Sequence, residues 1–191
     1  MKIQYFYIAP PRNAGEAVII FDPVDMYQKG RTAYQYLCGQ RRVKLAPEIG
    51  FDTPVSTQSG VIVYDEAYLF NGSMERYHFK LIGKKEVYVP YNAYRATYMT
   101  KTANELLGPK HMNPDLVRWE LHRVWVVEGT LRPGKRHIFH KRRLYIDEDS
   151  WAALASDNHD AHGNIYRVGL AFQVPSYDMP RLMRMRIYTR I

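Results

Sequence analysis

Histidine and carboxylate side chains that could bind a metal ion gather in two short segments. His137 and His140 lie three residues apart in "HIFH", and the segment 157–163 reads "DNHDAHG". Residues three apart on a strand point to opposite faces, so His137 and His140 cannot share an ion without a bulge. The second segment is typical of a tight turn, in which Asp160 and Gly163 shape the backbone and the imidazoles face water. We therefore expect no metal site and no cofactor.

Carboxylates that could act in acid–base catalysis occur together in "DEDS" at 147–150. General acid–base chemistry needs two carboxyl groups that face one pocket and differ in pKa. Consecutive acids at the end of a strand instead indicate a capped turn. The sequence also contains no G-x-S-x-G, no H-E-x-x-H and no glycine-rich phosphate loop, and "FDTP" lacks the glycine of an aspartic-protease loop. We expect a protein that is not an enzyme.

A basic stretch, "RPGKRHIFHKRR" at 132–143, contains six Arg or Lys residues and no acid, and it resembles a phosphate-binding stripe. Strand alternation would divide these charges between two faces. No RNP-like, zinc-finger or helix-turn-helix signature accompanies them. The pattern favours a solvated sheet edge, and nucleic acid is not the partner that we expect.

The composition indicates β structure, because tyrosine occurs 16 times in 191 residues. A tyrosine ring packs on a half-buried sheet while its hydroxyl group stays hydrated. The single cysteine, Cys38, excludes an internal disulfide and a thiolate metal cluster. The first residues lack the apolar region and cleavage site of a signal peptide, and no apolar run reaches the roughly 18 residues that span a bilayer.

Short apolar or aromatic runs between turn residues predict about nine strands and two or three short helices. The first strands are expected at 3–8, 16–21, 32–37 and 40–45, of which the last two flank "CG" as a hairpin, followed by a long surface loop at 46–60. The expected helical turns lie at 64–72, at 102–109 with Thr102 as N-cap, and at 113–120 with Asn113 as N-cap. No repeat or linker divides the chain, and the fold class is mainly β (α+β).

The segment 117–151 is expected to be a hairpin centred on "PG" at 133–134. An even loop there would pair Trp125 with Arg142 and Val127 with His140. One face would then carry Leu121, Trp125, Val127, Leu131, Ile138, Leu144 and Ile146, with Arg123, Arg136, His140 and Arg142 among them. The other face would carry His122, Val124, Val126, Glu128, His137, Phe139, Lys141 and Arg143. The first face is more apolar, so we assign it inward.

Four phrases together resemble a bacterial envelope family, domain of unknown function 1329. They are "AYQYLCGQRRVKLAP", "YDEAYLFNGSMERYHFKLIGKKEVYVPYNAY", "NPDLVRWELHRVWVVEGTLRPGKRHIFHKRRLYIDEDSW" and "YRVG", in order over about residues 3–178. The resemblance implies a lipoprotein-carrier-like fold, in which a strongly curved antiparallel sheet, an incomplete barrel, wraps short helices and offers a hydrophobic concavity. It also implies a periplasmic location, a suggested role in outer-membrane lipoprotein sorting and a link to exporters of the resistance-nodulation-division type. The family supplies no catalytic residues.

The inward face and the resemblance together predict a ligand-binding concavity. Its apolar lining would be Trp125, Val127, Ile138, Leu144 and Ile146. Arg123 or Arg142 would meet an anionic head group, and each buried methylene would contribute about 0.8 kcal/mol. The same residues could equally form a closed core under the helices, and the sequence leaves that alternative open.

The ends of the chain depart from the family. Relatives are about twice as long and begin with an export signal and earlier strands, whereas this sequence begins almost directly with a strand. At the other end, "RLMRMRIYTRI" after 180 places four arginines in eleven residues. We therefore expect one carrier-like domain over 1–178, truncated as in a gene fragment, and a divergent basic tail over 179–191. Without an export signal, the chain would remain in the cytoplasm as expressed.

Two functions are expected, of which the resemblance implies the first. The first is a non-enzymatic periplasmic or envelope carrier that binds a hydrophobic ligand, a lipid or a lipoprotein acyl chain, and serves a membrane exporter or an outer-membrane partner. The alternative is an interaction or assembly module whose basic sheet binds an anionic protein, a membrane or nucleic acid. The net charge of +8 and the pI near 9.5 are compatible with this alternative.

Overall fold

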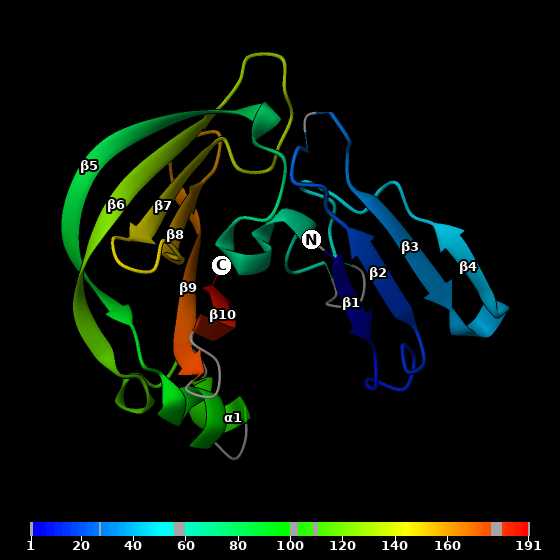
Figure 1. The fold of residues 1–191 in the computed structure, drawn as a ribbon, viewed down its shortest axis with the longest axis horizontal. Coiled ribbons are helices and arrows are strands. Elements are labelled where there is room, and N and C mark those ends of the chain that lie inside the picture. The colour runs from blue at the N-terminus through cyan, green and yellow to red at the C-terminus, as the bar shows by residue number, and fades with distance from the viewer. Residues whose placement is uncertain are drawn as a thin grey trace. The chain divides into compact units, whose positions relative to one another are not determined.

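The structure is a computed structural model that describes residues 2–26, 28–55, 60–99, 103–108, 111–176 and 181–190. For residues 99 and 103, and from 175 onward, it describes the backbone alone. The described chain forms two antiparallel sheets in two compact units (Figure 1). The first unit is Met1–Glu66 with Asn71–Glu75, and the second is Ala67–Phe70 with Arg76–Ile191. None of the described helices has the length and apolar character needed to cross a membrane.

The first unit contains a four-stranded sheet in the order β1-β2-β3-β4. Its strands are β1 (Lys2–Phe6), β2 (Ala17–Phe21), β3 (Thr32–Leu37) and β4 (Arg42–Leu45). The short turn Cys38–Gln40 joins β3 to β4, which confirms the hairpin expected around "CG".

The core of the first unit explains why the expected loop 46–60 is not wholly at the surface. Alternate residues of β2 and β3, such as Ile20 and Ala33, turn one face of the sheet toward Ala46 and Ile49, and all four are buried. Apolar side chains in this segment therefore cover the sheet, and the prediction of a surface loop is wrong for them. Residues 56–59 lie outside the described part of the chain.

The second unit contains a six-stranded antiparallel sheet in the order β10-β9-β8-β7-β6-β5. Its strands are β5 (Tyr77–Pro90), β6 (Trp119–Leu131), β7 (Lys141–Asp147), β8 (Ala153–His159), β9 (Ile165–Ser176) and β10 (Arg181–Arg190). Figure 1 shows a strong curve in this sheet, and β5 also approaches β8 and β9. The sheet thus curls on itself without closing, which confirms the expected curved antiparallel fold with few short helices.

The described residues between β4 and β6 include five short helical segments. They are η3 (Tyr64–Leu69), η4 (Met74–Arg76), η5 (Arg95–Met99), α1 (Ala103–Leu106) and η6 (Pro114–Leu116). The cap at Asn113 is confirmed, because its side chain accepts a hydrogen bond from the backbone N–H of Asp115 at 3.1 Å. The expected N-cap Thr102 lies outside the described residues. In η3 the backbone leaves the helical region at Ala67 and Tyr68.

The hairpin of β6 and β7 is confirmed, but its expected register is wrong. Trp125 pairs with Ile146 and Val127 pairs with Leu144, a shift of four residues along β7 from the expected pairs. The connection 132–140 is an irregular loop, closed by a hydrogen bond of 2.9 Å from the Leu131 N–H to the His140 carbonyl, and not a tight turn. Because the shift is an even number of residues, the expected division of the strand residues between two faces is kept.

Each face of the hairpin contains buried residues. Arg142 and Leu144 are buried on the face assigned inward, and Val124 and Val126 are buried on the opposite face. Val124 and Val126, expected on the outward face, are 0% and 1% exposed and belong to a core cluster with Val89 and Leu154. Val89 on β5 and Leu154 on β8 are separated by two strands, so this face lies inside the curl. The assignment of this face to solvent is therefore wrong, since alternation can divide residues between two faces but cannot show which face is covered.

The arginine-rich end of the chain pairs with the rest of the sheet. Arg181–Arg190 runs antiparallel to β9, with Ile187 opposite Ala171. Residues 177–180 and 191 lie outside the described residues. The division into a domain at 1–178 and a tail at 179–191 stays a prediction.

Candidate functional site

An apolar patch lies on the face of β5, β6 and β7 that the sequence assigned to a ligand. The opposite face, with Val124 and Val126, lies inside the curl, so the patch is on the outer face of the sheet and not in the expected concavity. Leu81, Val127 and Leu144 face one another in neighbouring strands, and Trp125 and Ile146 do so in the next row. Side chains that are directly opposite in antiparallel strands lie in contact range. Leu81 is 57% exposed, and Trp125, Val127 and Ile146 are half-buried. We call Leu81, Trp125, Val127 and Ile146 the sheet patch.

Charged side chains border the sheet patch next to Trp125. The Lys84 ammonium group lies 4.2 Å from the centre of the Trp125 ring and also pairs with the Glu148 carboxylate. Arg123 donates through Nε to the same carboxylate. Hydrogen bonds from Lys84 and Arg123 lower the pKa of Glu148, so this carboxylate is ionised and neutralises part of the two positive charges. Two cations, Lys84 and Arg123, therefore lie at the border of the sheet patch, and both pair with the Glu148 carboxylate.

Arg142, expected to meet a ligand head group, is fully buried instead. Its Nε donates to the Asn158 side-chain oxygen at 3.1 Å, and its Nη2 donates to the Leu69 carbonyl at 2.9 Å. The guanidinium also lies over the rings of Phe70 and Phe139, 4.8 and 5.2 Å from their centres. These contacts fix the segment Ala67–Phe70 on the sheet.

The structure therefore brings together only some of the residues expected to bind a ligand. Trp125, Val127 and Ile146 belong to the sheet patch, and Arg123 lies at its border. Leu144 is buried in the row of Leu81 and Val127, Arg142 is buried in the row beside it, and Ile138 is 40% exposed in the loop 132–140.

Sequence reasoning missed Leu81, Lys84 and Glu148. The bulge between Leu81 and Gly83 breaks the alternation of β5, so its apolar residues do not mark one face. Pairing of β5 with β6 is a contact between distant segments, and nothing in the local pattern indicates it.

The acidic segment and the "HIFH" segment serve turns and packing. Asp147 accepts hydrogen bonds from the Ser150 N–H at 3.1 Å and its hydroxyl at 2.6 Å, which confirms the capped turn. His137 is buried, and its Nδ1 accepts from the Phe139 N–H at 3.0 Å. His140 is exposed, and both histidines lie in the connecting loop, so the expected strand alternation does not apply to them.

The segment 157–163 contains the tight turn that the sequence indicated. Asp160 accepts hydrogen bonds from the N–H groups of His162 and Asn164, each at 2.9 Å. Gly163 has φ of 83°, a conformation that side chains disfavour. His162 is exposed as expected, but His159 is only 7% exposed, because it belongs to the end of β8 and not to the turn.

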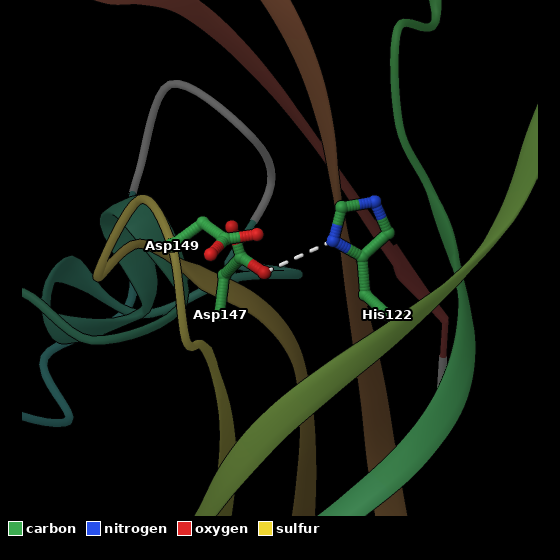
Figure 2. Close-up of side chains that lie close together, drawn as sticks. All are labelled: His122, Asp147 and Asp149. Carbon is green, nitrogen blue, oxygen red and sulfur yellow. Dashed lines mark hydrogen bonds and ion pairs between the residues drawn. The ribbon is translucent and has the colours of Figure 1, made fainter.

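Side chains of the types that can bind a metal ion come together from different elements at His122, Asp147 and Asp149 (Figure 2). His122 lies on β6 and Asp147 ends β7, while Asp149 belongs to the following turn. One potential ligand atom from each residue lies within 4.8 Å of the other two. The His122 Nδ1 is 3.0 Å from the Asp147 Oδ1, and the Tyr91 ring stacks on the imidazole at 4.0 Å between centres. Burial opposes ionisation of Asp147, but hydrogen bonds from Ser150 and His122 lower its pKa below the ordinary value.

A small cavity lies within the first unit, and its lining includes Met26, Arg31, Phe51 and Ser73. Arg31 is fixed there by two hydrogen bonds to the Asp22 carboxylate, of 2.6 and 3.0 Å. The volume of about 140 Å³ is below the several hundred cubic ångströms of pockets that enclose larger ligands. This cavity is too small to enclose a lipid.

Comparisons with known proteins show a family and a fold. The family model described as "Protein of unknown function (DUF1329)" matches residues 1–189. An uncharacterized protein from Pseudomonas aeruginosa is 42% identical over 170 residues, which are 89% of this chain and 37% of that protein. The chain thus spans well under half the length of this relative.

Two solved structures share the fold at low sequence identity. One, from Vibrio parahaemolyticus, is a domain named for a proposed role as an outer membrane lipoprotein-sorting protein. It has a TM-score of 0.59 and 14% identity, with 98% of this chain and 64% of that chain covered. The other is a DUF1329 family protein from Desulfovibrio piger, with a TM-score of 0.58, 12% identity and coverage of 97% and 62%.

Proposed function

The chain belongs to the DUF1329 family, and from this premise we propose that it is a non-enzymatic envelope carrier that binds a hydrophobic ligand on its curved sheet. The ligand class is a lipid or the acyl chain of a lipoprotein. The fold shared with the lipoprotein-sorting domain of Vibrio parahaemolyticus supports the proposal. The observation that carries it is the sheet patch, in which apolar side chains of three adjacent strands are left partly exposed beside two cations.

The chemistry of the sheet patch suits an amphipathic ligand. A methylene chain laid over Leu81, Trp125 and Val127 would gain about 0.8 kcal/mol for each methylene group removed from water. An anionic head group would compete with Glu148 for Lys84 and Arg123. Because both cations are already paired, the head group would add selectivity more than affinity. Apolar contact is therefore the main source of binding.

The proposal includes a place and a partner. A carrier of this kind acts in the periplasm, where it would pass its ligand to an exporter of the resistance-nodulation-division type or to an outer-membrane partner. The place and the partner are supported by the family resemblance. The six-stranded sheet supports the carrier fold and says nothing about the partner.

The test is native mass spectrometry of the chain produced in a Gram-negative host behind a borrowed export signal. We expect a lipid-sized mass on the folded protein. Trp125→Asp should remove that mass, because a carboxylate on the sheet patch repels an apolar chain. Trp151→Asp is the matched control, since Trp151 is 72% exposed and lies outside the sheet patch.

The outcomes separate the carrier from its alternative. A folded protein that carries no lipid-sized mass would overturn the proposal, as would a Trp125→Asp variant that keeps the adduct of the unchanged protein. Circular dichroism checks that each variant is folded. If Trp125→Asp does not fold, the milder Trp125→Gln variant tests the same contact.

A second candidate function is the interaction module with a basic surface. The observation in its favour is that Lys135 and Arg136 are exposed in the loop 132–140. Such a surface would attract an anionic protein or membrane through long-range charge, with little burial of apolar area.

A further inference from the structure

We propose that His122, Asp147 and Asp149 bind a divalent transition-metal ion, with Zn²⁺ as the best-matched probe. The sheet brings the first two ligands together. Val124 lies opposite Asp147 in the β6–β7 ladder, so His122, two residues before Val124, is diagonal to Asp147 on the same face. Asp149 follows in the turn after β7, and Figure 2 shows the imidazole pointing toward both carboxylates.

The distances fit two ligands of one ion. Zinc binds imidazole nitrogen and carboxylate oxygen at about 2.0–2.2 Å, which places neighbouring ligand atoms about 3 Å apart. The His122 Nδ1 and the Asp147 Oδ1 are already 3.0 Å apart. An ion between them would replace the shared proton without moving either element. Asp149 has to move only a short distance, because its oxygen is within 4.8 Å of the other ligand atoms.

Metal-bound histidines usually donate their second N–H to a carboxylate, and a carboxylate lies near the far side of this imidazole, beyond hydrogen-bond distance. The His122 Nε2 faces the Glu120 carboxylate at 3.8 Å. Glu120 is itself held by the Arg118 Nε at 2.8 Å and by the Asn92 side chain at 2.9 Å. When Nδ1 binds the ion, its proton can therefore be carried on Nε2 next to an acceptor. The stacked Tyr91 ring fixes the plane of the imidazole.

The carboxylates differ in a way that suits metal binding. Asp147 is buried and oriented by Ser150, so it is a fixed ligand. Asp149 is exposed, and its side chain has no hydrogen bond or ion pair with the residues that the structure describes. Its negative charge lies beside a second carboxylate, and no cation forms an ion pair with it among the described residues. A cation would remove this repulsion, and solvent reaches the site from the side of Asp149.

The ligand set selects among metals. One imidazole and two carboxylates suit Zn²⁺ or another first-row divalent ion better than Cu⁺, which prefers thiolates and thioethers. Three protein ligands leave a further position for water or for a group of another molecule. Sequence reasoning missed this site because His122 and Asp147 are 25 residues apart, and only the strand pairing joins them.

The test is titration of the chelator-treated full chain with Zn²⁺, followed by isothermal calorimetry and by native mass spectrometry. We expect one zinc ion per chain. Asp149→Asn should weaken zinc binding by at least about tenfold, and it should not lower the melting temperature of the metal-free protein, because the Asp149 side chain makes no hydrogen bond or ion pair with the described residues and its charge lies beside a second carboxylate. His122→Gln should weaken binding as well.

The matched control is His162→Gln, which removes an exposed histidine from the 157–163 turn. This variant should bind zinc like the unchanged protein. Absence of zinc binding at micromolar concentration would overturn the proposal. Binding that survives both Asp149→Asn and His122→Gln would also overturn it, because the ion would then lie elsewhere. A zinc mass and a lipid mass differ in native spectra, so this result does not depend on the carrier function.

Discussion

Three arginines of the second unit have three different tasks at the scale of single residues. Arg142 is buried and binds backbone and amide oxygens, so it stabilises the packing of Ala67–Phe70. Arg143 donates to Glu128 at 2.7 Å and is partly exposed. Arg123 is mostly exposed and shares Glu148 with Lys84. Strand alternation places these charges on two faces, and the partner of each one decides whether it serves stability or recognition.

The Glu128–Arg143 pair predicts a dependence of stability on pH. The hydrogen bond from Arg143 holds the pKa of Glu128 below its ordinary value, so the folded state favours the ionised carboxylate. Its contribution is present above the pKa of Glu128 in the unfolded chain and is lost as the pH falls through the lower folded value. Glu128→Gln should cost about 1 kcal/mol in unfolding free energy at pH 7 and progressively less below pH of about 4.

Urea denaturation at several pH values measures this effect. Glu48→Gln is the control, because Glu48 forms an exposed pair with Lys44 at 3.7 Å. Its effect should be small at every pH. A Glu128→Gln deficit that stays the same from pH 7 to pH 3 would contradict the assignment.

Close packing of the segment Ala67–Phe70 on β9 is the main feature at the scale of elements. Gly169 of β9 lies under Leu69, and a Cβ atom there would stand 2.6 Å from the Leu69 Cδ2 and 2.8 Å from the Ser156 Oγ. The absence of a side chain at 169 lets Leu69 reach 2% exposure. The same approach brings the Leu69 carbonyl within reach of Arg142.

Gly169→Ala should therefore destabilise the second unit by about 1–3 kcal/mol, since added atoms in a packed region force neighbours apart. Chemical denaturation followed by circular dichroism measures the loss. Gly39→Ala is the control, because a Cβ atom at 39 would meet nothing within 4 Å. The double variant Gly169→Ala with Leu69→Val should lose less than the sum of the single losses. Unchanged stability of Gly169→Ala would show that Leu69 does not pack on β9.

The sequence predicts individual turns and caps better than it predicts which strands pair and in which register. Asn113 and "CG" at 38–39 are short signals that cap or turn the backbone, and both are confirmed. The register of the β6–β7 hairpin depends on how the loop 132–140 packs, for which Pro and Gly give no information. Trp125 and Val127 were assigned to one face by alternation alone, but Leu81 and Lys84 could not be added, because pairing between β5 and β6 is set by the fold as a whole.

The net charge of +8 is the property of the whole molecule that separates the two proposed functions. A basic protein is attracted to anionic surfaces by long-range charge. The screening length of this attraction falls from about 10 Å at 0.1 M salt to about 3 Å at 1 M salt. An acyl chain on the sheet patch is held by apolar contact, which salt does not weaken. Added salt should therefore weaken binding to an anionic surface and leave lipid binding on the sheet patch unchanged.

The corresponding prediction is that lipid occupancy stays constant between about 0.05 and 0.5 M salt, while adhesion to anionic vesicles falls steeply over the same range. Occupancy is measured by extracting lipid from the purified protein after incubation at each concentration. Adhesion is measured by co-sedimentation with phosphatidylglycerol vesicles, and phosphatidylcholine vesicles are the neutral control. Lipid that leaves the protein as salt rises would contradict binding on the sheet patch and favour the charged surface, because only a ligand held chiefly by its head group would respond to screening.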